Sequence, residues 1–222
     1  MLFSTLFNYR KFRLPRKWSN RELKKIAHLF DGEIINVSGW DDRDKEGGFY
    51  CGYFSNAKAY YISNYQGKRG IEESGGKTNF DIDLEATLPD YLINRFDVVF
   101  NHTTLEHVFN IFQSFKNLCL LSRDIVIVIV PFTQQVHISE SFSDFWRFTP
   151  HAIRRLFNEN NMDIIYLTFN NTHNSSNYIF AVGSRNPEKW RDKMPPSENK
   201  AALSDWIGEP SWLYHFKRLF AK

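Results

Sequence analysis

Two histidines and a glutamate near the middle of the chain have the chemistry of metal ligands. His102, Glu106 and His107 follow the apolar run FDVVFN and form the spacing H-x-x-x-E-H. Histidine nitrogens and carboxylate oxygens are common zinc ligands. However, this spacing differs from both H-E-x-x-H and H-x-x-E-H, the zinc patterns with which it would be compared. We therefore interpret Glu106 and His107 as residues at the start of a helix that support a neighbouring site, and we predict no metal.

Polar residues also end the predicted strands. In open α/β sheets, ligands bind beyond the carboxyl ends of the strands, so these residues predict a ligand site. In the stretch IINVSGWDD, the first predicted strand runs into a polar turn. Nucleotide-binding folds place a glycine-rich loop at this point, but the turn here has a single glycine beside a tryptophan. The strand-end residues are Asn36, Ser38, Gly39, Trp40 and Asp41, then Asn64 and Tyr65, then Asp83, Leu84 and Glu85, then Asn101, His102 and Thr103, and finally Pro131 and Phe132.

Seven apolar or β-branched runs are the elements that would position these residues. They span residues 33–38, 59–63, 79–84, 96–101, 124–131, 163–169 and 178–184. The run DIVIVIVP from Asp124 to Pro131 has no polar alternation, so both of its faces should be buried. This pattern predicts a central parallel strand with helices on both sides.

Helical patterns lie between several of these runs. Ser19 with Glu22 forms a capping box for a helix over 19–30, residues 105–121 repeat apolar side chains at steps of three and four, and Thr149 with Pro150 begins a helix to Asn160. The link NNTHNSSN between the last two runs is too short and polar for a helix, so those strands should pair antiparallel. The fold class is therefore α/β, a doubly wound, mostly parallel seven-stranded sheet with an antiparallel terminal hairpin.

Two segments resemble a known family. FDVVFNHTTLEHV resembles the fourth-strand region of class I S-adenosylmethionine-dependent methyltransferases. DIVIVIVPF, followed by His137 and DFWRFTPHAIRRLF, resembles a bacterial subgroup of methyltransferases of the type 11 kind with a WRFTP element. The resemblance covers about Asp31 to Ser184. It implies a Rossmann-like methyltransferase fold, S-adenosylmethionine as cofactor and, through that subgroup, a role in bacterial surface polysaccharide biosynthesis.

The resemblance also implies which residues meet the cofactor, and several depart from the family pattern. Asn36 stands where the first strand usually ends in an acid, Ser38 and Trp40 stand at the usual glycine positions around Gly39, and Asn64 replaces the acid that grips the ribose. Asp83 is retained near the adenine position, beside Leu84, and Asn101 lies where cofactor and substrate meet. Two interpretations follow: a working site in which Asp41 or Asp42 takes over, or a binding module that has lost its cofactor.

For O-methylation, the resemblance favours a base and substrate contacts after the fifth strand. His137 is the candidate catalytic base, although a loop histidine bonded to the backbone fits equally. Arg147, beside Trp146, would hold a phosphate or sugar acid, unless it forms a structural salt bridge to Asp144 or Glu140. His102 completes the expected substrate side. The acceptor would be a small molecule or a glycolipid.

Other functional classes lack their motifs. A nicotinamide oxidoreductase would need G-x-G-x-x-G after the first strand, which is absent. A nucleic-acid methyltransferase that modifies amino groups would carry an Asn/Asp-Pro-Pro-aromatic turn after the fourth strand, where this chain has Asn101-His102-Thr103-Thr104, so no nucleic acid is expected. The non-catalytic module remains the main alternative to the enzyme.

Charge and composition suggest three regions. Residues 1–25 contain eight Lys or Arg and one Glu, whereas the remainder has 20 basic and 24 acidic residues. We divide the chain into a basic, aromatic arm (1–18), a methyltransferase-like domain (19–185) and an extension with an amphipathic helix (186–222). The arm suits an anionic membrane surface or a nucleic-acid backbone, or it is a solvated extension. Two cysteines and no run of 18 apolar residues favour a cytoplasmic protein, peripheral to the inner membrane at most.

Overall fold

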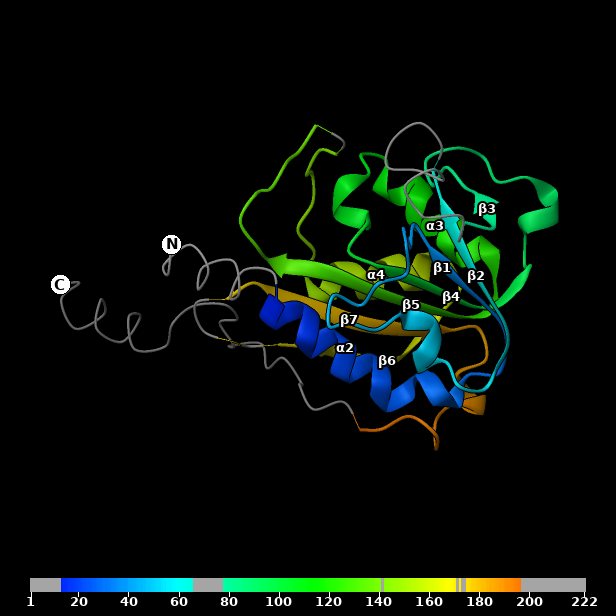
Figure 1. The fold of residues 1–222 in the computed structure, drawn as a ribbon. Coiled ribbons are helices and arrows are strands. Elements are labelled where there is room, and N and C mark those ends of the chain that lie inside the picture. The colour runs from blue at the N-terminus through cyan, green and yellow to red at the C-terminus, as the bar shows by residue number, and fades with distance from the viewer. Residues whose placement is uncertain (1–12, 66–77, 141, 171, 173–174, 197–222) are drawn as a thin grey trace.

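Seven strands form one mixed sheet in the order β3-β2-β1-β4-β5-β7-β6 (Figure 1). The computed structural model describes residues 13–65, 78–140, 142–170, 172 and 175–196. The strands are Gly32–Val37 (β1), Ala57–Asn64 (β2), Phe80–Asp81 (β3), Phe96–His102 (β4), Ser122–Thr133 (β5), Asp163–Phe169 (β6) and Asn177–Ser184 (β7). Neighbours from β3 to β5 pair in parallel, and β7 is antiparallel to both β5 and β6. The predicted fold class is confirmed, including the antiparallel hairpin.

Strand β5 lies inside the sheet, between β4 and β7, and is buried on both faces. Alternate side chains of a strand point to opposite faces of its sheet. Val126, Val128 and Val130 accordingly join one core cluster, whereas Ile125 and Ile127 join the other. The unbroken apolar run of this strand therefore fills both halves of the core, as predicted.

The three α-helices among the described residues cover both faces of the sheet (Figure 1). Helix α2 (Leu14–Ile26) lies on one face, and helices α3 (Ile111–Leu121) and α4 (Pro150–Glu159) lie on the other. The predicted cap of α4 is confirmed, because Thr149 Oγ1 accepts a hydrogen bond from Ala152 N at 3.1 Å and Pro150 begins the helix.

Three predicted element boundaries are wrong. Helix α2 begins at Leu14, so Ser19 lies inside it and the predicted capping box does not form. The helix expected over 105–121 is interrupted, with a short 3-10 helix at Leu105–His107 and α3 only from Ile111. The strand expected over 79–84 is reduced to Phe80–Asp81.

Residues outside the expected domain limits, 19 and 185, also pack on the domain. Leu14–Trp18 belong to α2, although the sequence places them in the basic arm. Trp190, beyond Arg185, is buried, and its ring lies 5.1 Å from that of Phe30. Most of the arm and the amphipathic helix expected near the end lie outside the described residues. No helix within the described ranges is both long and apolar enough to cross a membrane.

Candidate functional site

A cavity of about 480 Å³ opens at the carboxyl ends of β1, β2 and β4. Five of the nine predicted cofactor residues line it: Ser38, Trp40, Asn64, Asp83 and Leu84. The lining also includes residues that the sequence analysis did not assign to the cofactor, namely Tyr65, Ile82, Glu85, Thr103, Thr104, His107, Val108, Phe109, Phe142, Ser143 and Phe145. The site therefore lies at the end of the sheet where the strand-end residues predicted it.

Two non-glycine residues of the loop after β1 have the backbone conformation that glycine adopts most easily. Ser38 and Trp40 have φ angles of 56° and 52°, in the left-handed region that glycine enters most easily. Gly39 between them serves a different purpose, since a Cβ there would lie 2.6 Å from both Cγ and Nδ2 of Asn36. Ser38 and Trp40 thus adopt a left-handed backbone at the positions where the resemblance implies glycine, and this conformation strains a residue that has a Cβ.

Asn64, at the end of β2, holds this loop instead of pointing freely into the cavity. Its Oδ1 accepts a hydrogen bond from Trp40 N at 2.7 Å, and its Nδ2 donates to Trp40 O at 3.1 Å. The same Nδ2 donates to Thr78 Oγ1 at 2.6 Å. Only an amide can satisfy both an N–H and a carbonyl in this way, because a carboxylate has no donor. The replacement of acid by amide is therefore structurally required here.

Asn36, at the end of β1, is buried in a second network. Its Nδ2 donates to Asp42 Oδ1 at 2.8 Å, and that oxygen also accepts from Tyr60 Oη at 2.7 Å. The other oxygen of Asp42 accepts from Cys51 N at 2.9 Å. Burial, followed by the charge and hydrogen bond of Asp42, raises the pKa of Tyr60 well above its ordinary value. Asp42 is therefore a structural anchor of the loop.

Asp41 and Asn101 also lie outside the cavity lining. Asp41 pairs with Arg43 at 2.8 Å. Asn101 is buried, and its Nδ2 donates to Val37 O at 2.9 Å, so it joins β4 to β1. Its Oδ1 is buried without a hydrogen-bond partner among the described residues. Asp41, Asn101, Asn36 and Gly39 are thus close to lining residues in the sequence but are not part of the lining.

His102, expected on the substrate side, faces helix α2. Arg16 Nη1 donates to His102 Nδ1 at 2.8 Å, which assigns the ring proton to Nε2, and Nε2 lies 2.9 Å from Ser19 Oγ. Arg16 also donates to Tyr50 Oη and Thr103 Oγ1, both at 3.0 Å. Burial, then the Arg16 charge, lowers the pKa of His102 well below its ordinary value. His102 is thus a neutral, buried connector, and the expectation that it contacts substrate is not supported by its position.

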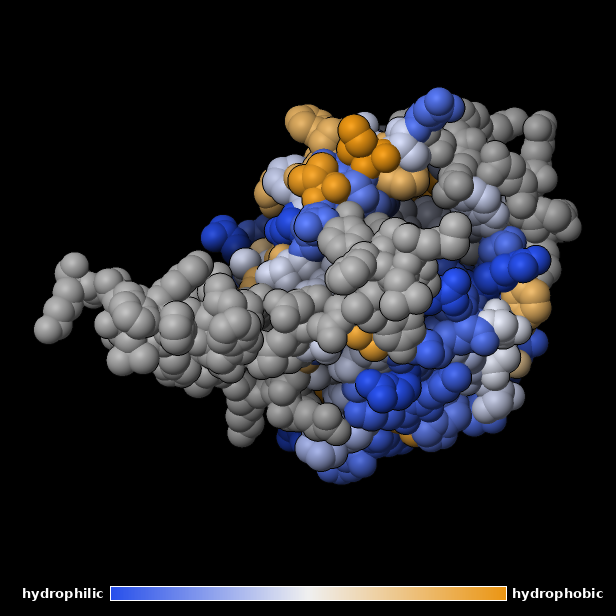
Figure 2. Space-filling view, turned by 60° about the vertical axis from the view of Figure 1, so that its left-hand side comes forward, coloured by the Kyte–Doolittle hydropathy of each residue, from blue (hydrophilic) through white to orange (hydrophobic). Residues whose placement is uncertain are grey.

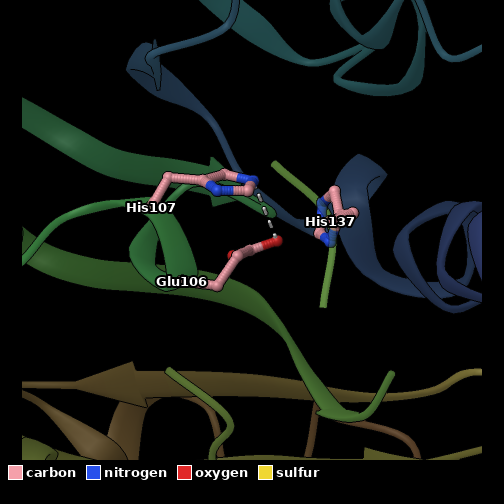
Figure 3. A group of neighbouring side chains, drawn as sticks. All are labelled: Glu106, His107 and His137. Carbon is pink, nitrogen blue, oxygen red and sulfur yellow. Dashed lines mark ion pairs between the residues drawn. The ribbon is translucent and has the colours of Figure 1, made fainter. Parts of the chain in front are cut away.

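Glu106, His107 and His137 come together at the cavity edge (Figure 3). His107 lines the cavity; its Nδ1 donates to Ser143 O at 2.6 Å, which leaves Nε2 as the acceptor nitrogen, 3.8 Å from Glu106 Oε1. The ring centroids of His107 and His137 are 5.0 Å apart. Glu106 is buried, which raises its pKa to about 8. His137, the base that the sequence predicts, is not in the cavity lining, whereas the neighbouring His107 is.

The WRFTP element anchors the loop that carries His137. Asp144 accepts hydrogen bonds from His137 N at 2.7 Å and from both Nη atoms of Arg147. Burial acts to raise the pKa of Asp144, but hydrogen bonds from Arg147 outweigh it and lower the pKa to about 2. Arg147 gives its remaining N–H groups to the carbonyls of Gln134, Gln135 and Trp146. All five of its donors are engaged, so the structural salt bridge to Asp144, one of the two expected interpretations, is present.

Trp146 also holds a loop in place. Its Nε1 donates to Val108 O at 2.9 Å, and its ring packs against the core cluster on the α3 and α4 face. Neither Trp146 nor Arg147 lines the cavity. Both hold the two loops that form one of its walls.

Two exposed phenylalanines line the cavity, and two further exposed apolar side chains lie in the loop after β5. Phe109 and Phe145, in the lining, are 68% and 46% exposed, with ring centroids 5.3 Å apart. Val136 and Ile138, in the loop after β5, are more than 70% exposed. Figure 2 shows strongly hydrophobic residues gathered at one end of the visible face. Exposed apolar side chains in the lining suit an acceptor with an apolar part.

The lining fits the cofactor that the resemblance implies. The volume is within the usual range for small-molecule sites. S-adenosylmethionine combines cationic groups with an adenine ring, and the lining offers the carboxylates of Asp83 and Glu85 with aromatic side chains such as Trp40 and Tyr65. The ribose-binding carboxylate is missing, since Asn64 stands in its place and is bonded to Trp40.

Comparisons with known proteins agree on the fold. No protein-family model and no curated protein matches the chain. Among solved structures, magnesium protoporphyrin IX methyltransferase from Synechocystis with bound S-adenosylmethionine is similar over 77% of each chain, at 13% identity and a TM-score of 0.51. The 1,6-didemethyltoxoflavin-N1-methyltransferase of Burkholderia thailandensis is similar over 82% of this chain and 85% of its own, at 12% identity and a TM-score of 0.53. An S-adenosylmethionine-dependent methyltransferase from Clostridium acetobutylicum is similar over 82% and 97%, at 9% identity and a TM-score of 0.53. The chain has the Rossmann-like fold of class I S-adenosylmethionine-dependent methyltransferases.

Proposed function

We propose that the protein is an S-adenosylmethionine-dependent methyltransferase that binds its cofactor in the cavity at the carboxyl ends of β1, β2 and β4. The observation that carries the proposal is the lining itself, in which Trp40, Asp83 and Leu84 meet at the position that the family resemblance implies. When bound, the cofactor supplies an electrophilic methyl group. Asp83 would hold the cofactor, and the aromatic side chains of the lining would exclude water from the acceptor.

The histidines at the cavity edge favour transfer to an oxygen. His107 lines the cavity with its Nε2 as acceptor, so it can take a proton from a hydroxyl in the cavity. His137 packs against it and is held by Asp144 at 3.0 Å from its Nδ1. His137 remains the predicted base, and His107 is the residue through which it would reach an acceptor.

The proposed acceptor is a hydroxyl of a sugar or glycolipid in bacterial surface polysaccharide biosynthesis, at the cytoplasmic membrane face. The WRFTP resemblance and the exposed phenylalanines of the cavity, Phe109 and Phe145, support a glycolipid in particular. An anionic membrane would be bound by the basic residues before α2. Vesicle co-sedimentation tests this part: binding should require anionic lipid, weaken with salt and fall when residues 1–12 are removed. Removal of residues 1–17 would cut into α2 and is not a clean test.

One observation favours the alternative, a methyltransferase-fold module that binds no cofactor. The amide of Asn64 is bonded to Trp40 and Thr78 at the place of the ribose-binding acid. A cofactor ribose would have to compete with these contacts or bind without them.

Calorimetric titration with S-adenosylmethionine and S-adenosylhomocysteine distinguishes the two proposals. The enzyme should bind at least one of them at micromolar concentration. Asp83→Asn should weaken binding roughly 10- to 100-fold, the equivalent of a charged hydrogen bond. Asp163→Asn makes the same charge change at an exposed position away from the cavity and should leave affinity unchanged. Absence of binding by the folded protein would establish the non-catalytic alternative.

A further inference from the structure

We propose that Glu106, His107 and His137 form a binding site for a divalent transition-metal ion of the zinc class. One ligand atom from each residue lies within 4.8 Å of the others (Figure 3). The spacing H-x-x-x-E-H by itself predicts no metal, because it matches neither H-E-x-x-H nor H-x-x-E-H. It could not anticipate that His137, from the loop after β5, would replace His102 as the second histidine.

The second ring nitrogen of His107 is arranged as in metal-binding histidines. A histidine ligand usually gives its other ring N–H to a carbonyl or a carboxylate, which orients the ring. His107 Nδ1 donates to Ser143 O at 2.6 Å, so its Nε2 is the acceptor nitrogen. His137 Nδ1 lies 3.0 Å from Asp144 Oδ2, but these two atoms do not form a hydrogen bond. A backbone carbonyl thus orients the His107 ring, and the Asp144 carboxylate lies beside the His137 ring.

Glu106 supplies a buried carboxyl oxygen that a cation would satisfy. Its side chain is 1% exposed, and its Oε2 has no hydrogen-bond partner among the described residues. A buried carboxyl oxygen without a partner is costly unless a proton or a cation satisfies it. Arg147, although close by, has its donors on Asp144 and backbone carbonyls. No described side chain therefore satisfies this oxygen, and a bound cation would do so in place of a proton.

The ligand set indicates which metals would bind. Two imidazoles and one carboxylate are typical of Zn²⁺ sites that keep a fourth position open, whereas Mg²⁺ and Ca²⁺ prefer oxygen ligands alone. With bonds of 2.0–2.2 Å, neighbouring ligand atoms of a tetrahedral site lie about 3.4 Å apart. Glu106 Oε1 and His107 Nε2 are 3.8 Å apart, and the three ligand atoms lie within 4.8 Å of one another, so side-chain rotations that bring them closer would complete the site. Because His107 lines the cavity, the open position would face it.

This proposal does not depend on methyl transfer, so its test uses binding alone. Tag-free, chelator-treated protein is titrated with Zn²⁺, Co²⁺ and Mg²⁺. One equivalent of Zn²⁺ should bind with a dissociation constant below about 10 µM, and Mg²⁺ should not compete. His107→Ala, His137→Ala and Glu106→Gln should each weaken Zn²⁺ binding at least tenfold. His151→Ala and Cys51→Ser, which alter exposed potential ligands elsewhere, should bind like the parent.

Two results would overturn the site. One is a parent protein that binds no Zn²⁺ in this range, and the other is unchanged affinity in both histidine variants. If a variant fails to fold, judged by circular dichroism, the Co²⁺ spectrum of the unsubstituted protein decides. Tetrahedral coordination gives intense visible absorption, whereas a weak spectrum like that of aqueous Co²⁺ would contradict the proposal.

Discussion

Asn64 and Trp40 close the loop after β1 onto β2 through two hydrogen bonds, one to the backbone N–H and one to the carbonyl of Trp40. This relationship explains why an amide stands where the family resemblance implies an acid. From sequence alone, restoring the acid with Asn64→Asp is expected to tighten cofactor binding. The contacts argue for a different result.

Asn64→Asp should destabilise the protein. It removes the donor that bonds Trp40 O and Thr78 Oγ1, and it places a carboxylate against a carbonyl oxygen. The expected loss in free energy of unfolding is about 1–3 kcal/mol, measured by urea denaturation. S-adenosylhomocysteine binding should not become tighter, because the new carboxylate opposes the loop conformation. Asn158→Asp, an exposed change of the same kind on α4, is the control. Equal stability of both variants, or tighter binding by Asn64→Asp, would contradict this interpretation.

The adjacent residues Ser38 and Gly39 of the loop after β1 should differ in how substitution by glycine or alanine changes the stability of the protein. Ser38→Gly should be more stable than Ser38→Ala by roughly 0.5–1 kcal/mol, because only glycine relieves the left-handed backbone at φ 56°. Gly39→Ala should lose about 1–3 kcal/mol, since its Cβ would meet the Asn36 side chain at 2.6 Å. Thermal and urea unfolding of the three variants provide the comparison. A stabilising Gly39→Ala would show that Asn36 can move without cost.

The sequence predicts well where a pattern is local and continuous. The apolar run of β5 specified a strand buried on both faces, and Thr149 with Pro150 specified the start of α4. Five of the residues predicted to bind the cofactor line one cavity, because parallel strands end at one edge of a sheet.

What the sequence did not predict depends on contacts between distant residues. Ser19 was read as a helix cap because Glu22 follows it at the right spacing, but Glu22 accepts a hydrogen bond from Tyr166 Oη at 2.8 Å inside the fold. His102 and His107 are similar in sequence context, yet His102 ends β4 and faces α2, whereas His107 belongs to the 3-10 helix that follows and lines the cavity. The only sequence signal for His107 was its place in the segment after β4.

Arg16 is a further residue whose role depends on contacts with distant residues. Its substitution tests whether it belongs to the fold or is a surface charge of the basic arm. Its guanidinium bonds Tyr50, His102 and Thr103, which lie at least 34 residues away in the sequence. Arg16→Ala leaves buried polar atoms without a donor and should cost about 2–4 kcal/mol of unfolding free energy. Arg16→Lys should recover little, because an ammonium cannot reach three partners in one plane.

Arg13→Ala is the matched control for Arg16, because Arg13 is exposed at the start of α2. It should alter stability by no more than about 0.5 kcal/mol. Should Arg13→Ala and Arg16→Ala have the same effect on stability, Arg16 would act as a surface charge of the arm and not as part of the core.

The contact between the chain after β7 and the sheet should depend on pH through Asp124. Its carboxylate accepts hydrogen bonds from Ser184 Oγ at 2.6 Å, Trp190 Nε1 at 2.9 Å and Asn186 N at 3.1 Å. Burial acts to raise the pKa of Asp124, but these hydrogen bonds outweigh it and lower the pKa. A carboxyl group with a lowered pKa in the folded state stabilises the fold fully above its unfolded pKa of about 3.9. That stabilisation is lost as the pH falls through the folded value.

Asp124→Asn should therefore be less stable than the parent by roughly 2–3 kcal/mol at pH 7, because neutral acceptors form weaker hydrogen bonds than a carboxylate. The difference should shrink below pH 4, where the parent begins to lose the same interaction by protonation. Urea unfolding between pH 3 and pH 7, followed by Trp fluorescence, measures both curves. Asp163→Asn, at an exposed position, should parallel the parent throughout. A stability difference for Asp124→Asn that stays constant down to pH 3 would mean that shape, and not charge, makes Asp124 important for holding Trp190 against the sheet.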